Sequence, residues 1–361
     1  MLLSRARPSS VEAILRDLAS NDAAVRVQAA DECASVIGDV EGEPRTRVIA
    51  ALVRALGADG HAQARAAAAL ALADLRAHEA LPALLVAADD DAPLVRQLAI
   101  TALGEIGDVR ARERIRRALG DERPEVRFQA IVAFPRLAKR DDDEAGTFDA
   151  WSALQTGLAD DDAQVRGRAA EACGELADAG PLPDAIADRL AALLDGKSQP
   201  SDVRVASAIA LAESGDMRGE GVLLDVMAGR IQDPDPGRVQ AAFELAGELG
   251  LEAARPLAQS AAFGFRAIVG DPGRHTAAIV ALVRLGDARA IEHVLSGFTA
   301  RSFGKRMLAV AIAGRAELVD ARPHLQSLRR DARLADPEAV DDALARIDAA
   351  DSSRRVDEDA S

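Results

Sequence analysis

The sequence predicts an all-α protein, built as a solenoid of about ten helix pairs. Three observations predict this fold class. Aromatic residues make up only 2% of the 361 residues, apolar side chains recur at helical spacing, and one phrase returns along the chain. Pro93–Asp108 reads PLVRQLAITALGEIGD and Ala163–Asp178 reads AQVRGRAAEACGELAD. Chains rich in Ala, Leu, Arg and Glu form helices that pack closely through small side chains.

A basic residue in each copy of the phrase serves as an anchor that marks the repeat. The anchors are Arg26, Arg65, Arg96, Arg127, Arg166, Arg204 and Arg238, followed by His275 and Lys305 at the equivalent places. Most intervals between anchors are 31 to 39 residues. That period is typical of a two-helix repeat.

Each repeat divides into a first helix, an Asp-rich turn and a second helix. Glu79–Asp89 is an example of the first helix, and the second helix starts near the anchor. Ala99 and Leu103 stand three and seven residues after Arg96, so they share a helix face, which we expect to be packed. Aspartates in the turn are suited to capping the second helix.

Four turn aspartates stand six residues before four anchors. The pairs are Asp59 and Arg65, Asp90 and Arg96, Asp121 and Arg127, and Asp160 and Arg166. With this spacing the chain resembles HEAT-repeat proteins, specifically the phycobilin-lyase HEAT-like repeat family. The resemblance implies a right-handed superhelix with the second helices on its concave side. We expect one solenoid over residues 1–350, with weaker repeats after about residue 200, and a disordered acidic tail over residues 351–361.

Two interpretations of the Asp and Arg series are open. The arginines could form a row of cations for an anionic ligand, or the two residue types could bond within and between repeats as a structural ladder. We favour the ladder, because charges that are buried or half-buried are normally paired.

Other candidate sites are weak. Cys33 and Cys173 stand seven residues after an anchor, where Leu72 and Leu103 stand in other repeats, so packing explains them. A single His-Glu pair, His78 and Glu79, cannot supply a metal site. Phosphate-binding, hydrolase and dinucleotide motifs are absent from the sequence. We therefore expect no catalytic residue, no cofactor and no metal.

Charge and hydropathy limit the partners. The formal net charge is −15, which opposes binding to nucleic acid or to an anionic membrane. The sequence has no apolar run that approaches the ~20 residues of a membrane span, and its start does not read as a signal peptide. We expect a soluble, cytoplasmic protein.

One helix face remains for function. Residues one and five positions after the anchor lie opposite the packed face, and in later repeats they are apolar. We expect this strip to form a concave groove with a charged rim for a partner helix or an extended peptide. Its residues are Phe128, Val132, Val205, Ile209, Val239, Phe243, Val280 and Val310, with Glu175 and Glu213 tuning specificity.

Three alternatives to an open groove remain. The solenoid could curl tightly, two chains could pair through the strip as a homodimer, or a one-residue register error in the later repeats could place these side chains in the core. For function, we expect a non-enzymatic scaffold or adaptor that binds a protein partner. The alternative, implied by the resemblance, is an enzyme of the chromophore (bilin) lyase type.

Overall fold

The computed structural model describes residues 10–38, 40–138, 144–177, 182–196, 198–233, 235–264 and 271–359. Within these ranges the regular structure is helical throughout, and the α-helices form ten successive pairs. This confirms the prediction of an all-α solenoid. The predicted right-handedness of a superhelix stays a prediction.

The bounds of the helices follow the predicted alternation of first and second helices. The first helices are α1 Val11–Leu18, α3 Glu43–Ala58, α5 Leu81–Ala87, α7 Arg112–Ala118, α9 Glu144–Gly157, α11 Asp184–Ala192, α13 Glu220–Met227, α15 Arg255–Phe263, α18 Ala288–Gly297 and α20 Arg322–Leu328. The second helices are α2 Ala23–Ile37, α4 Ala62–Asp74, α6 Pro93–Ile106, α8 Pro124–Ala138, α10 Ala163–Ala177, α12 Ser201–Glu213, α14 Pro236–Glu248, α17 Pro272–Arg284, α19 Phe303–Arg315 and α21 Pro337–Asp359.

The chain divides into two compact units. Unit 1 is Met1–Leu190 and unit 2 is Ala191–Ser361, so the boundary falls inside α11. The sequence predicts one continuous solenoid over residues 1–350, and the repeat pattern contains no signal for this division beyond its weakening near residue 200. Each unit has its own apolar core.

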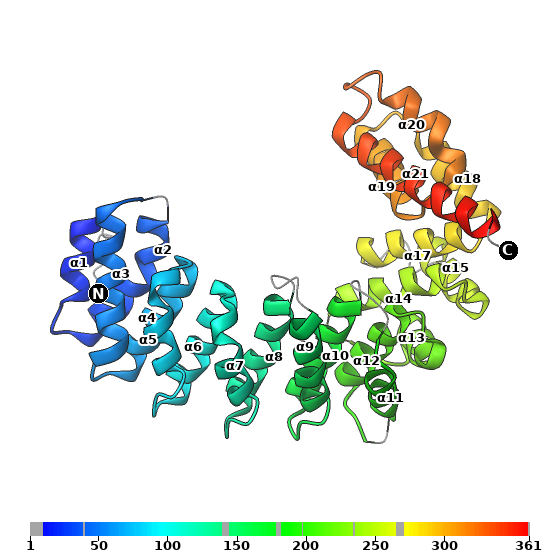
Figure 1. Ribbon diagram of the computed structural model, residues 1–361. Helices are drawn as coiled ribbons and strands as arrows, with labels where there is room; N and C mark the ends of the chain where they lie inside the picture. Colours follow the sequence, from blue (N-terminus) through cyan, green and yellow to red (C-terminus); the bar gives the residue numbers. More distant parts are fainter. Residues whose placement is uncertain are drawn as a thin grey trace, which may run out of the picture. The chain divides into compact units, whose positions relative to one another are not determined.

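Within each unit the helices form two layers (Figure 1). In unit 1 each second helix packs on the next one, from α2 through α4, α6 and α8 to α10, while α1, α3 and α5 pack on one another in the first layer. In unit 2 the second helices α12, α14, α17, α19 and α21 form the same kind of series.

Small residues allow the second helices to approach closely. A Cβ atom added to Gly104 on α6 would lie 2.8 Å from the Cβ of Ala133 on α8. One added to Gly247 on α14 would lie 2.6 Å from the Cα of Ala281 on α17. Both glycines belong to the recurring Gly-Glu phrase. At these two positions the phrase therefore sets the distance between neighbouring second helices.

The connection from a second helix to the next first helix uses a left-handed residue. After α12, the Asp216 amide donates to the Leu211 carbonyl and the Gly215 amide to that of Ala212, both at 2.9 Å. Gly215 has φ +80°. This is the Schellman arrangement, which satisfies the last carbonyls of the helix. Arg76 and Glu317 hold positive φ values of 47° and 54° at the equivalent places.

Helix α21 covers most of the segment that the sequence predicts to be a disordered tail. Helix α21 continues through Asp359, and residues 360 and 361 lie outside the described part of the chain. The segment after residue 350 contains neither Gly nor Pro, so nothing in it breaks the helix. Asp351 also accepts a hydrogen bond from Arg322 on α20 at 3.1 Å.

Candidate partner-binding site

The anchor arginines are held in a ladder between repeats. Arg96 on α6 donates from Nε and Nη2 to the two carboxylate oxygens of Asp121, at 2.8 and 3.0 Å. Asp121 lies in the turn of the following repeat, where its Oδ1 also accepts the Arg123 amide at 2.9 Å. The same bidentate pair joins Arg26 to Asp59, Arg65 to Asp90 and Arg127 to Asp160.

Within a repeat the contact is made to the main chain instead. The Nη1 of Arg96 donates to the carbonyl of Asp90, six residues earlier, at 3.0 Å. Arg65, Arg127 and Arg166 donate in the same way to Asp59, Asp121 and Asp160, at 2.9, 2.9 and 2.6 Å. The predicted ladder therefore exists, but the four side-chain pairs join neighbouring repeats. The six-residue spacing reflects a carbonyl contact.

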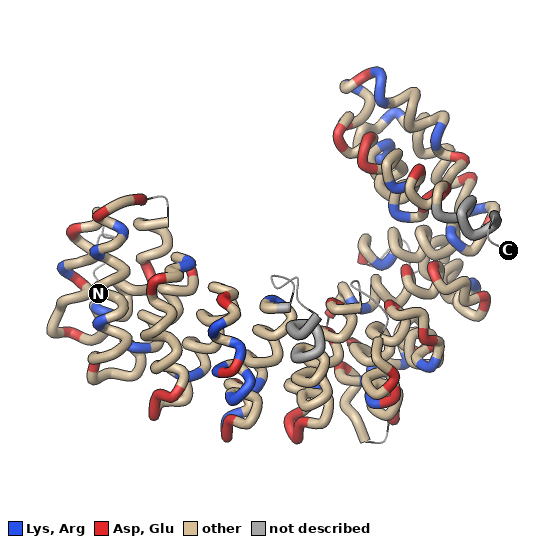
Figure 2. Tube along the Cα trace, in the orientation of Figure 1, with Lys and Arg blue, Asp and Glu red and all other residues tan. Residues whose placement is uncertain are grey.

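The ladder keeps its carboxylates charged. The hydrogen bond from Arg26 lowers the pKa of Asp59, against an opposing effect of burial. Burial raises the pKa of Asp121, but the hydrogen bonds from Arg96 and from the Arg123 amide outweigh it, so the pKa lies below its usual value. For Asp90 and Asp160, burial likewise raises the pKa and hydrogen bonds outweigh it, so both pKa values lie below their usual value. With both guanidinium and carboxylate satisfied, these four turns serve structure (Figure 2 shows acidic residues at the turns between α5 and α6, α7 and α8, and α9 and α10).

The hydrogen bonds in unit 2 show that one anchor was assigned to the wrong residue. Arg306, not Lys305, donates to the carbonyl six residues earlier, that of Ala300, at 2.7 Å. Its Nε donates to Leu334 in the next repeat at 2.6 Å. Each step along a helix turns the side chain by about 100°, so the one-residue error moved Val310 from the packed face to the predicted groove.

In unit 2 the predicted groove is wrong at four positions. Val205, Phe243, Val280 and Val310 are buried members of the core. Ile209 and Val239 are partly buried against that core. These four side chains are already buried within the chain itself, so a partner cannot contact them. They stabilise the fold instead.

Charged side chains also make contacts between the second helices of unit 2. The guanidinium of Arg274 on α17 lies 5.6 Å from the centre of the Phe243 ring on α14. Arg315 on α19 donates to Glu244 on α14, and Arg284 on α17 donates to Glu248 on α14 at 2.8 Å. Charged side chains thus join α14, α17 and α19.

The equivalent face in unit 1 remains accessible. Phe128 and Val132 on α8 are partly exposed, as predicted. Phe128 lines a pocket of about 450 Å³ formed by residues of α6, α8 and α10. Leu70 lies on the same face of α4, five residues after its anchor, and is 36% exposed. Sequence reasoning missed Leu70, although the same offset rule finds it.

Three glutamines from three successive second helices surround Phe128. Gln97 on α6, Gln129 on α8 and Gln164 on α10 all line the pocket. Among the described residues, none of their side-chain amides makes a hydrogen bond. Glu125 and Asp162 complete the pocket on its acidic side. An aromatic ring beside free amides can hold an apolar side chain and hydrogen-bond the main chain that carries it.

The two predicted specificity residues are exposed. Glu175 on α10 accepts from Arg168 of the same helix at 2.7 Å, so its carboxylate is already paired. Glu213 lies at the end of α12. Neither residue lines the Phe128 pocket.

Both cysteines lie in the core, as the packing interpretation predicts. Burial raises the pKa of Cys33 to about 12 and also raises that of Cys173, so both remain protonated and weakly nucleophilic. In the described ranges, no three His, Cys, Asp or Glu side chains come together in a way that could hold a metal ion. None of the helices there is long and apolar enough to cross a bilayer.

Comparison with known proteins agrees with this geometry. A family model described as HEAT repeats matches residues 82–172. No curated protein matches the sequence. YibA of E. coli is similar in structure, with a TM-score of 0.54 and 20% identity over 77% of this chain and 92% of that chain.

Two further solved structures are similar. Kap121p bound to Pho4p gives a TM-score of 0.51 and 14% identity over 92% of this chain and 41% of Kap121p. The complex of CpcE and CpcF of phycocyanin lyase from Nostoc sp. PCC7120 gives a TM-score of 0.44 and 18% identity over 71% of this chain and 95% of that chain. At these identities the similarity shows the fold alone, and the last score carries no argument. The chain is an α-helical solenoid whose residues 82–172 match the family model of HEAT repeats.

Proposed function

We propose that this chain is a non-enzymatic HEAT-repeat adaptor, and that unit 1 binds an extended segment of a protein partner at the Phe128 pocket. The observation that carries the proposal is the partly exposed aromatic ring among three amides without hydrogen-bond partners. Ordinary packing leaves such a ring buried and such amides in solvent at random positions, whereas here successive second helices present them together.

The recognition mode follows from the chemistry of the pocket. An apolar side chain of the partner would pack on Phe128, and Gln97 and Gln129 would hydrogen-bond its main chain, since an amide both donates and accepts. Glu125 and Asp162 favour a basic residue next to the apolar one. Kap121p, which shares this fold, is bound to Pho4p in its structure, and this supports a solenoid surface as a place for a protein partner.

Affinity capture from the source cells with matched variants tests the proposal. Phe128→Asp should lose the partner that the unmodified chain captures, because it places a charge on the apolar contact. Val86→Asp is the control, since Val86 is 74% exposed and lies on a first helix. Circular dichroism should show both variants folded. Capture of the same proteins by all three chains would refute the Phe128 site.

The non-enzymatic part has its own test. The chain is incubated with bilin and an apo-phycobiliprotein, and the visible absorbance spectrum is followed. We expect no change. A shift that depends on the chain would contradict an adaptor without activity.

A further inference from the structure

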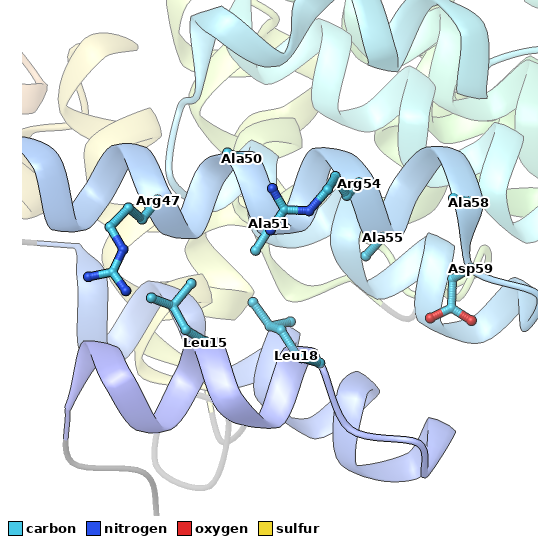
Figure 3. A pocket seen from close by; sticks show the side chains of 10 residues that line it. Leu15, Leu18, Arg47, Ala50, Ala51, Arg54, Ala55, Ala58 and Asp59 are labelled. Carbon is cyan, nitrogen blue, oxygen red and sulfur yellow. The ribbon is translucent and has the colours of Figure 1, made fainter.

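A second concave surface lies in the first-helix layer of unit 1, away from the Phe128 pocket. It is a groove of about 570 Å³ between α1 and α3 (Figure 3). Helix α3 has 16 residues and α1 has 8. The longer helix therefore extends beyond the end of its neighbour, and Ala55 and Ala58 lie past Leu18 along it (Figure 3).

The floor of this groove is apolar. Leu15 and Leu18 of α1 face Ala51 and Ala55 of α3 across it (Figure 3). Leu15 and Ala55 are only partly buried, so apolar surface stays in contact with water at the bottom of a concave site. Burial of this surface by a partner removes apolar area from water and so favours binding.

The charge of the groove is positive, although the chain carries a net charge of −15. Arg54 is exposed and, among the described residues, has neither an ion pair nor a hydrogen bond through its side chain. Arg47 is held at the rim by Glu12, at 2.8 Å. The acidic residue of the lining, Asp59, is neutralised by Arg26 of the ladder. One guanidinium beside the apolar floor is thus left without a counter-charge.

We propose that the α1–α3 groove binds an acidic amphipathic helix of a partner protein. The apolar face of that helix would cover Leu15, Leu18 and Ala55, and a carboxylate at its edge would pair with Arg54. This is the helix-in-groove mode of recognition, in which anchors recur at i, i+3 or i+4, and i+7. Residues 1–9 of the chain itself carry Arg5 and Arg7 and no acidic residue, so they have the wrong charge for this groove.

Two synthetic peptides of about 15 residues supply the probes. One carries Leu at i, i+3 and i+7 with Glu on the flanks, and the other replaces each Glu by Lys. Fluorescence anisotropy with the full chain should show binding of the Glu peptide and about tenfold weaker binding of the Lys peptide. Arg54→Glu should weaken the Glu peptide about tenfold and strengthen the Lys peptide.

Two controls keep the result specific. Arg330→Glu removes another exposed arginine, in unit 2, and should leave both affinities unchanged. Phe128→Asp should also have no effect, because this site is independent of the proposed function. Equal affinity for the two peptides, an unchanged affinity in Arg54→Glu, or loss of binding in Phe128→Asp would overturn the proposal. Binding that appears only after removal of residues 1–9 would also overturn it, because the chain itself would then fill the groove.

Discussion

Replacement of Gly247 by Ala adds one methyl group where α14 meets α17. The new Cβ would lie 2.6 Å from the Cα of Ala281, 3.0 Å from its carbonyl oxygen and 3.2 Å from its carbonyl carbon. Non-bonded carbon atoms normally lie about 3.5–4.0 Å apart. All three neighbouring atoms belong to the main chain of α17, so no side-chain rotation can relieve the contact and the two helices must separate.

The size of the effect follows from two opposing contributions. Ala is intrinsically better than Gly in a helix by roughly 0.5–1 kcal/mol, which would stabilise the variant. Overpacking of a close contact costs about 1–3 kcal/mol. We expect overpacking to win, since the main chain is rigid, and the free energy of unfolding to fall by about 1–2 kcal/mol.

Gly57→Ala is the matched control. Gly57 also lies in a helix, α3, and a Cβ added there would have nothing within 4 Å. This variant should be as stable as the unmodified chain or slightly more so. Urea unfolding followed at 222 nm compares the midpoints, and hydrogen exchange should place the loss in α14 and α17. The reasoning is refuted if Gly247→Ala proves at least as stable as Gly57→Ala.

Four further predictions concern the ladder, the core and a turn. Arg96→Met should lower the free energy of unfolding by roughly 2 kcal/mol, because it removes charge-assisted hydrogen bonds to Asp121. Urea unfolding measures this change. An unchanged free energy of unfolding would mean that the pair is only a surface contact. The folded pKa of Asp121 is depressed, so its stabilisation is present above the unfolded value near 4 and is lost as the pH falls through the folded value; Asp121→Asn should therefore lose less stability than the unmodified chain between about pH 5 and pH 3. Phe243→Ala should lower the free energy of unfolding by roughly 3–5 kcal/mol, because the ring is fully buried. Phe128→Ala should lower it by clearly less. Similar thermal midpoints for the two variants would contradict the assignment of Phe243 to the core and Phe128 to the surface. Arg76→Gly should raise the thermal midpoint, because a φ of +47° costs a residue other than Gly about 1 kcal/mol.

The sequence predicts the fold well because each helix pair repeats the same local signals. The Asp turn, the anchor Arg and the small packed residues recur, so one correctly interpreted repeat predicts its neighbours. The limits appear where a prediction depends on contacts between repeats. The anchor spacing suggested pairing of Asp90 with Arg96, but Asp90 pairs with Arg65 of the preceding repeat, because the carboxylate and the guanidinium of one turn point to opposite neighbours.

The groove was predicted along both units, but four of the predicted positions in unit 2 are buried, for a similar reason. The offset rule places Phe128, one residue after its anchor, and Phe243, five residues after its anchor, on the same face, opposite the packed one. Whether that face is open depends on side chains of other repeats, such as Arg274 of α17, whose guanidinium lies 5.6 Å from the centre of the Phe243 ring. Contacts in unit 2 reach as far as from Arg315 of α19 to Glu244 of α14. No local pattern contains a contact across 71 residues, so periodicity cannot distinguish an open face from a covered one.

The ladder also distinguishes the residues that hold the repeats together from those that a partner can contact. Arg26, Arg65, Arg96 and Arg127 each bond a carboxylate of the next repeat and a main-chain carbonyl of their own. These four anchors and their turn aspartates are therefore held by the fold. The neighbours of the anchors are not committed: Gln97, Phe128 and Gly167 occupy the same offset in three consecutive repeats. A surface built from such positions can change its chemistry without altering the ladder that spaces it. In α6 and α8 of unit 1, where this face is open, recognition should therefore respond to substitutions one, two or five residues after an anchor, and stability to substitutions at the anchor itself.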